Sequence, residues 1–209
     1  MNRLSSPMRG VVAGLLAVTA LALVFAPSAS AQTGWPAACE DQVAERPFMP
    51  WADPAAYVLA PNGTVEQAAH WELEGGAVRA VGNERFHVND ADDASSLALP
   101  PGSSATTAPM CVGLEHPTLR LFARNRGALL SPLLVEVLFE DAAGSSRALP
   151  IGAYLGTSAW QPTTPLAVIA NLFAGLPGES VEVAFRFTPR GSAGNWSIDD
   201  VYVDPFRHG

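Results

Sequence analysis

The sequence predicts an all-β protein built as an antiparallel β-sandwich. Three observations lead to this fold class. Short runs rich in β-branched and aromatic residues follow one another along the chain. Segments rich in Pro, Gly and Ser separate these runs. No long segment shows the 3.6-residue apolar period of an amphipathic helix. A series of short strands with turns between them is typical of an antiparallel sandwich.

Eight runs are expected to form strands. In chain order they cover residues 55–60, 69–74, 78–81, 96–99, 118–124, 133–140, 180–188 and 196–203. The fourth run ends at Pro100-Pro101-Gly102, and the small residues 103–109 that follow are interpreted as a linker. Residues 142–178 are ambiguous, because an apolar run such as 166–173 suits a strand and a short helix equally well.

Alternation within the longer runs assigns one apolar and one polar face to each strand. In the run 118–124, Arg120, Phe122 and Arg124 are expected on the polar face. Such strands pack one face on the core and leave the other in solvent. The expected core faces are Leu119, Leu121 and Ala123; Val135, Val137 and Phe139; and Val181, Val183, Phe185 and Phe187.

The chain has 209 residues and a formal charge of −8, and all 12 of its basic residues are arginines. This length predicts one domain with a core of its own. An acidic chain without lysine is a poor polyanion binder, because phosphate contacts need clustered cations. Nucleic acid and anionic membranes are therefore not expected as partners. The absence of lysine also excludes Schiff-base and P-loop chemistry.

Residues 1–31 are predicted to be a signal peptide. Arg3 and Arg9 precede the apolar run 10–26, and Ala29-Ser30-Ala31 fits a cleavage site. The apolar run is shorter than the roughly 20 residues that a spanning helix needs. We therefore expect a secreted, extracellular protein that is monomeric and has no membrane contact once the signal is removed.

Cys39 and Cys111 are predicted to form one disulfide, because they are the two cysteines of a chain expected to be exported. The bond would tie an N-terminal segment, residues 32–54, to a sandwich domain formed by residues 55–209. Two free thiols are the alternative.

Two motifs resemble those of carbohydrate-binding modules with the galactose-binding-like jelly-roll fold. Residues 62–66, Asn-Gly-Thr-Val-Glu, followed by Trp71 and the Gly75-Gly76 pair, resemble their opening N-G-x-F-E and W-x-x-x-G-G patterns, with Val65 in place of Phe. Residues 196–203, Trp-Ser-Ile-Asp-Asp-Val-Tyr-Val, resemble their last strand. The chain as a whole also resembles secreted proteins of high-GC bacteria. The resemblance implies a jelly-roll sandwich and carbohydrate binding.

The resemblance also implies a structural calcium ion, which Glu66 and Asp199 would help to hold. The residues themselves add an argument, because alternation places Asp199 on the same side as Val201, and a carboxylate on a core face is costly unless it is paired or bound to metal. Ile198 is apolar and out of phase, so a β-bulge is expected near Asp199 and Asp200. In the alternative, Asp199 accepts backbone N–H groups and binds no metal.

Trp160 and Tyr154 are the candidate ligand-binding residues. Aromatic rings offer an apolar face to sugar rings and can keep a polar edge in water. Both residues belong to an irregular segment and are expected to form an exposed platform. In the alternative, they cap the end of the sandwich.

Glu136 and Glu182 form the sharpest hypothesis for an enzyme. Both are expected mid-strand on polar faces, and a glycoside hydrolase needs two carboxylates across a cleft. In the alternative, Arg120 and Arg186 pair with them. No other catalytic or metal pattern appears, so we expect a non-catalytic protein that binds carbohydrate or cell-wall glycan. A structural or interaction protein of the cell envelope and a small jelly-roll glycoside hydrolase are the alternatives.

Overall fold

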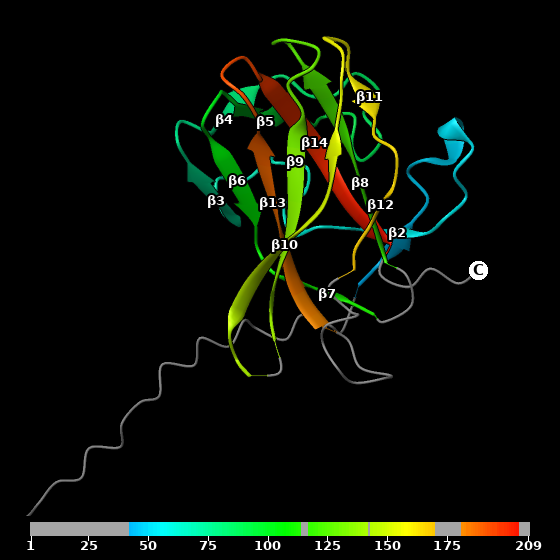
Figure 1. Cartoon of the computed structure of the whole chain (residues 1–209). Helices are drawn as coiled ribbons and strands as arrows, with labels where there is room; N and C mark the ends of the chain where they lie inside the picture. The colour runs from blue at the N-terminus through cyan, green and yellow to red at the C-terminus, as the bar shows by residue number, and fades with distance from the viewer. Residues whose placement is uncertain (1–41, 114–116, 142, 170–180, 205–209) are drawn as a thin grey trace, which may run out of the picture. The chain divides into compact units, whose positions relative to one another are not determined.

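The computed structural model describes residues 42–113, 117–141, 143–169 and 181–204, and these form an all-β sandwich of two antiparallel sheets (Figure 1). The eight-stranded sheet contains β1 (Ala44–Glu45), β2 (Tyr57–Leu59), β4 (Val78–Val81), β5 (Ser95–Leu99), β8 (Thr118–Asn125), β11 (Gln161–Pro162), β12 (Leu166–Ala167) and β14 (Trp196–Asp204). The six-stranded sheet contains β3 (Trp71–Glu74), β6 (Ser104–Thr107), β7 (Met110–Val112), β9 (Leu133–Glu140), β10 (Ser146–Tyr154) and β13 (Val181–Pro189). This architecture confirms the predicted antiparallel, jelly-roll sandwich.

The order of the strands places the last strand in the middle of the eight-stranded sheet. β14 pairs with β8 on one side and with β5 and β2 on the other, all antiparallel. The six-stranded sheet runs in the order β10-β9-β13-β6-β3, with β7 also paired to β13. The connection from β13 to β14 therefore passes from one sheet to the other.

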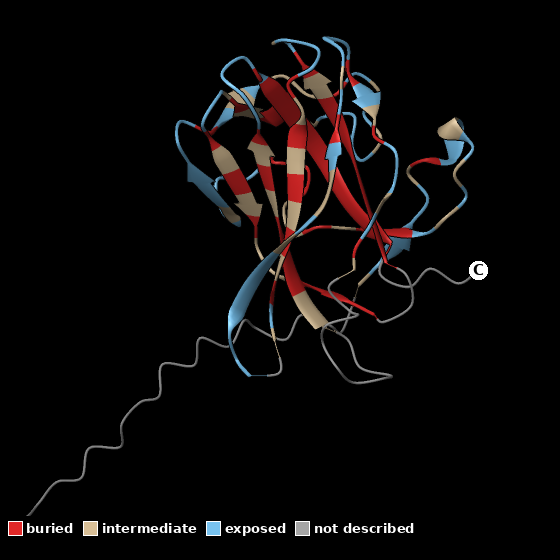
Figure 2. Cartoon of the chain, in the orientation of Figure 1, coloured by how far each residue is buried: buried red, intermediate tan, exposed pale blue. Residues whose placement is uncertain are grey.

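The core lies between the sheets and uses the faces that alternation predicts. Figure 2 shows the buried residues running along β8, β9, β13 and β14. The inward side chains of β9 and β13 are buried except for Val181, which is partly buried, and Trp196 is fully buried at the start of β14. The apolar members of this core include Leu119, Leu121, Val135, Val137, Phe139, Val183, Phe185, Phe187, Ile198 and Val201.

The outward face of β8 departs from the prediction, because it is covered. Phe122 is fully buried and Arg120 is 7% exposed. The chain before β2, which includes a 3₁₀ helix (Met49–Trp51), lays Phe48 on Phe122 with ring centroids 5.5 Å apart. Burial of this face depends on a segment about 70 residues away in sequence, and periodicity within β8 carries no information about it.

Phe48 anchors an aromatic cluster with Tyr57, Phe122, Trp160 and Tyr202. The Tyr57 and Tyr202 rings meet it edge-on, and the Arg120 guanidinium lies 4.3 Å from its ring centroid. Arg120 in turn pairs with Asp53, which also accepts a 2.8 Å hydrogen bond from the Tyr57 hydroxyl. The segment before β2 is thus an integral part of the covered face.

Replacing Phe48 by alanine is expected to lower the free energy of unfolding by about 3–5 kcal/mol, because it leaves a cavity under a buried aromatic cluster. The neighbouring Met49→Ala is the matched control, since Met49 is 51% exposed and should cost less than about 0.5 kcal/mol. Urea unfolding followed by tryptophan fluorescence measures both values. Equal, small effects would contradict a structural role for Phe48.

The predicted disulfide has one partner inside the described residues. Cys111 is buried in β7, and no described cysteine is free. Its carbonyl oxygen accepts a 3.1 Å hydrogen bond from the Gln42 side chain, which brings the start of the described chain beside β7. Cys39 lies outside the described residues, so the disulfide stays a prediction. The signal peptide also lies outside them; within them, no helix is long and apolar enough to cross a membrane.

Candidate functional site

A β-bulge in β14 creates the most unusual chemical environment among the described residues. The pairing of β14 with β8 shifts register between Asp199 and Tyr202, and Asp200 has a left-handed φ of 47°. This confirms the predicted bulge. An extra residue turns consecutive side chains away from strict alternation, and both Asp199 and Asp200 are fully buried.

Asp199 is held by backbone donors. Its Oδ2 accepts a 2.9 Å hydrogen bond from the Glu84 N–H, and its Oδ1 accepts one of 3.0 Å from the Asp200 N–H. Burial, and then the charge of Asp200, raise the pKa of the Asp199 carboxyl from 3.8 to about 9. Both oxygens of the Asp199 carboxylate, which was expected to bind calcium, therefore accept backbone N–H groups, as in the alternative given in the sequence analysis.

Asp200 carries the second buried carboxylate of the bulge. Neither of its oxygens has a hydrogen-bond partner among the described residues, although both are buried. Burial raises the pKa of this carboxyl from 3.8 to about 8, and the charges of Glu84, Asp93 and Glu66 add to the shift. A buried carboxylate without a partner is costly, so this position calls for a proton or a cation.

Glu84 brings a third buried carboxylate to the same place. Its side chain accepts hydrogen bonds from the backbone N–H groups of Phe86 and Val88, the latter at 2.9 Å. These bonds fold residues 84–88 into a tight loop, whose first N–H points at Asp199. The loop is therefore tied to the bulge by the hydrogen bond from the Glu84 N–H to the Asp199 carboxylate, while the Glu84 carboxylate holds the loop together.

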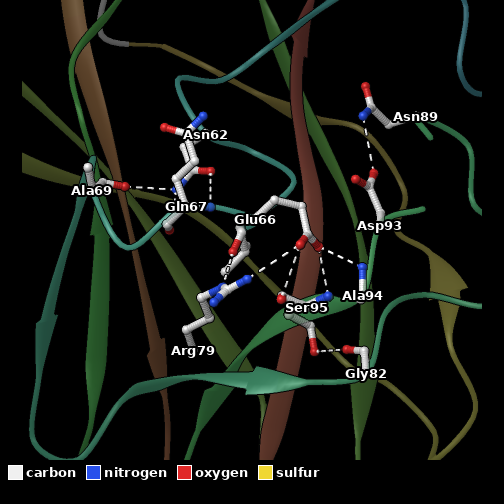
Figure 3. A network of polar contacts seen from close by, with 12 residues as sticks. Asn62, Glu66, Gln67, Ala69, Arg79, Gly82, Asn89, Asp93, Ala94 and Ser95 are labelled. Atoms are coloured by element: carbon white, nitrogen blue, oxygen red, sulfur yellow. Dashed lines mark hydrogen bonds and ion pairs between the residues drawn. The ribbon is translucent and has the colours of Figure 1, made fainter. Parts of the chain in front are cut away.

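Glu66 lies at the edge of the group of carboxylates formed by Asp199, Asp200 and Glu84, and its hydrogen bonds connect β5 to this group. Figure 3 shows its carboxylate directed at the start of β5, where Oε1 accepts a 2.8 Å bond from the N–H of Ala94, just before the strand, and a 2.7 Å bond from the N–H of Ser95. Its other oxygen lies 3.4 Å from the Arg79 guanidinium. Asp93, on the same loop as Ala94, has a raised pKa because of burial and the charge of Glu66.

These residues fit a hard divalent cation better than a transition metal. Calcium takes six to eight oxygen ligands from carboxylates, backbone carbonyls and water, and the group holds carboxylates without histidine or cysteine. Among the described residues, no set of three or more His, Cys, Asp or Glu side chains is arranged to hold a metal. A cation here would therefore combine the Asp200 carboxylate with backbone or water oxygens.

The prediction that Trp160 and Tyr154 form an exposed aromatic platform is wrong. Trp160 and Tyr154 are each only 5% exposed. Trp160 belongs to the aromatic cluster on the covered face, with the Arg124 guanidinium 4.5 Å from its ring centroid. Tyr154 ends β10 facing the core, and its hydroxyl donates a 3.4 Å hydrogen bond to the Leu119 carbonyl. Tyr154 also lines a hollow of about 240 Å³, together with Trp196 and the polar residues Thr157, Gln161 and Thr163.

The outward face of the six-stranded sheet carries the other charged group of interest. Arg186 and Glu136 stand opposite each other on β13 and β9 and form a 2.9 Å ion pair. Glu136, and then the charges of Glu74 and Glu72 on β3, raise the pKa of the Arg186 guanidinium. The alternative reading of Glu136 as a partner of Arg186 is therefore confirmed, whereas Arg120 pairs with Asp53.

The geometry does not favour the two-glutamate hydrolase. Glu136 is level with Arg186, while Glu182 lies four residues earlier on β13, opposite Cys111. A strand rise of about 3.4 Å per residue separates these levels by about 14 Å. The carboxyl groups of glycosidases lie about 5–9.5 Å apart, and Arg186 already binds Glu136.

Comparison with known proteins adds structural likeness only. No family model matches the sequence, and no curated protein matches it. Similar solved structures include the CBM22-1 xylan-binding domain of Paenibacillus barcinonensis Xyn10C, with 12% identity and a TM-score of 0.49 over 74% of this chain and 97% of that one. The family 11 carbohydrate-binding module of Clostridium thermocellum Lic26A-Cel5E shares 6% identity at a TM-score of 0.43, over 75% of this chain and 99% of that module.

The enzymatically active domain of bacteriophage CBA120 tailspike protein 4 is also similar, with 18% identity and a TM-score of 0.45. The match covers 68% of this chain and only 20% of that domain. Likeness of this degree carries no argument about what this chain binds. The sandwich described above rests on its own strand pairing.

Sequence reasoning found Asp199 and the bulge but missed Asp200 and Glu84. The signal available for Asp200 was its position next to Asp199 at a predicted bulge. A bulge disturbs the alternation of side chains, so Asp200 as well as Asp199 can point into the core. No local pattern marks Glu84, whose burial depends on contact with a strand 115 residues away.

Proposed function

We propose that this protein is a non-catalytic module that binds a neutral glycan on the outward face of its six-stranded sheet. The observation that carries the proposal is the difference between the two outward sheet faces. Phe48, Trp160 and their cluster cover the outward face of the eight-stranded sheet over β2, β8 and β14. The opposite face presents the Arg186–Glu136 pair at its centre, with 33% of the Arg186 side chain and 14% of the Glu136 side chain exposed.

The chemistry of the open face suits a polyhydroxylated ligand. Carboxylate oxygens accept hydrogen bonds from hydroxyl groups, and a guanidinium donates several in a fixed plane. Thr106 on β6 lies opposite Arg186, and the exposed Glu72 on β3 lies opposite Thr106, so these residues extend the Arg186–Glu136 pair into a row across the sheet. With three glutamates within electrostatic reach of one arginine, the face favours a neutral glycan over an acidic one.

A bound calcium ion forms part of the proposal. It would satisfy the Asp200 carboxylate and offset the repulsion among Asp199, Asp200 and Glu84. Its role here is structural, because it would hold the β14 bulge against the loop of residues 84–88 and not contact the glycan face. Export, the monomeric state and a location outside the cell remain predictions from the sequence.

A glycan array tests this function. The wild-type protein is expected to bind neutral plant or cell-wall glycans. The double variant Glu136→Gln/Arg186→Gln should weaken that binding at least tenfold, because charge-assisted hydrogen bonds contribute about 1.5–3 kcal/mol each. Released reducing sugar should be absent throughout.

The matched control is Asp141→Asn/Arg147→Gln. It removes an ion pair of the same type, with a 2.7 Å contact, at the β9–β10 hairpin instead of the centre of the sheet. This variant should bind glycan as the wild type does. Equal losses in both double variants, or no glycan bound by the wild type, would contradict the proposed site.

A further inference from the structure

Three loops lie together at one end of the sandwich, at the top of Figure 1. They are residues 126–131 between β8 and β9, 155–160 after β10, and 190–195 between β13 and β14. Backbone hydrogen bonds join the first and third of these loops: the Arg126 N–H donates to the Asn195 carbonyl over 2.8 Å, and the Ala128 N–H donates to the Ala193 carbonyl over 2.9 Å. The second loop is tied to the end of β8, where the Asn125 N–H donates to the Thr157 carbonyl over 2.7 Å. We call this group the loop end.

The loop end exposes large apolar side chains. Leu129 is 64% exposed, Leu130 is 85% exposed, and Leu155 on the neighbouring loop is 67% exposed. Single exposed leucines are ordinary on protein surfaces. Two of the three are consecutive on one loop and the third begins another loop at the same end, so the loop end is unusually apolar.

Charge is distributed unevenly between the loop end and the rest of the chain. The protein has 20 acidic residues, yet none lies in the three loops. Arg126 and Arg190 are exposed there, and the charge of Arg126 helps to lower the pKa of the Arg124 guanidinium. The loop end is therefore a local cationic surface on an acidic protein.

The loops are rigidly supported beneath the leucines. The Asn125 side chain accepts a 2.8 Å bond from the Gly127 N–H and donates a 2.9 Å bond to the Ala128 carbonyl. The buried Trp196 indole donates a 3.0 Å bond to the Ser131 carbonyl. Gly127 is required, since a Cβ there would lie 1.9 Å from the Ala193 carbonyl oxygen. The leucines are thus held outward on a pre-organised base, which lowers the entropic cost of binding.

From these observations we propose that the loop end docks on an anionic lipid membrane. The leucines would enter the boundary between headgroups and acyl chains, and Arg126 and Arg190 would meet lipid phosphates. A stable protein partner needs about 800 Å² on each side, which three leucines on loop tips do not offer. A lipid bilayer, in contrast, does not require a complementary protein surface of this area. This docking uses residues apart from the proposed glycan face, so either proposal can fail alone.

Vesicle co-sedimentation of the full mature chain tests the docking. The wild type is expected to bind phosphatidylcholine vesicles containing 30% phosphatidylglycerol, and binding should weaken as salt is raised. Leu129→Ser/Leu130→Ser should reduce the affinity roughly tenfold or more. Arg126→Gln/Arg190→Gln should reduce binding to the anionic vesicles down to the level seen with pure phosphatidylcholine.

The control is Val81→Ser, which removes a large apolar side chain that is 96% exposed on edge strand β4, the most exposed one outside the loop end in the described part of the chain. It should bind vesicles as the wild type does. All variants should keep the wild-type thermal midpoint, because the altered side chains are exposed. Three results would overturn the proposal: no binding to anionic vesicles, equal binding of the leucine variant, or self-association of the wild type that the leucine variant abolishes.

Discussion

Adding millimolar calcium to the metal-free protein is expected to raise its midpoint of thermal unfolding by about 5–10 °C. A ligand at one hundred times its dissociation constant adds about 2.7 kcal/mol, and 1 kcal/mol is worth about 2–4 °C in a chain of this size. The gain comes from the buried Asp200 carboxylate, which has no hydrogen-bond partner among the described residues. Differential scanning calorimetry in EDTA and in excess calcium measures the shift.

Asp200→Asn separates this effect from general screening of an acidic protein. The amide removes the charge that the cation would meet, so calcium should no longer raise the midpoint. Asp92→Asn is the matched control, because Asp92 is an exposed acid on the loop between β4 and β5, and its calcium response should equal that of the wild type. A shift of the same size in all three proteins would exclude a specific site.

In EDTA, the free energy of unfolding is expected to fall as the pH rises from about 4 to about 9. The pKa values of Asp199 and Asp200 are raised from 3.8 to about 9 and about 8, so the folded protein holds protons that the unfolded chain releases. The stability from this difference is complete below pH 4 and is lost as the pH rises through the folded values. At about 1.4 kcal/mol for each pKa unit, the loss should reach several kcal/mol.

Urea unfolding across this pH range checks the sign and the size of the slope. The double variant Asp199→Asn/Asp200→Asn should have a nearly flat profile in EDTA. Excess calcium should remove most of the slope for the wild type, because the cation binds the deprotonated carboxylates. A wild-type profile in EDTA that is flat, or that rises with pH, would show that the two carboxyl groups titrate normally.

The strands that the sequence predicts are those with clear alternation or β-branched runs. Residues 78–81 and 133–140 form strands with these same bounds, and the last run extends by one residue to Asp204. The sequence predicts a linker at residues 103–109, where β6 forms, because these residues are small. β10 lies within residues 142–178, for which the sequence predicts no definite element. Pro150 and Gly152 fall inside this strand, and the pairing with β9 shifts register there and accommodates both on an edge strand.

The candidate site was predictable only in part. Alternation placed Asp199 on the core side, and a bulge was expected beside it. Which carboxylate would be left without a donor depended on where the Glu84 N–H lies, and that contact joins residues 115 apart. The expected platform failed for a similar reason, because Trp160 is buried by rings from β2, β8, β14 and the segment before β2.

By itself, the sequence determined the all-β class, most of the strands and the inward face of each long strand, because these follow from local spacing of apolar residues. Tertiary structure alone decided which outward face is covered, since Phe48 and Phe122 meet only after folding. It also decided where charge gathers. A net charge of −8 argued against anionic partners, but folding collects loops without acids at one end. Burial and electrostatic potential depend on neighbours in space, and a linear pattern does not contain them.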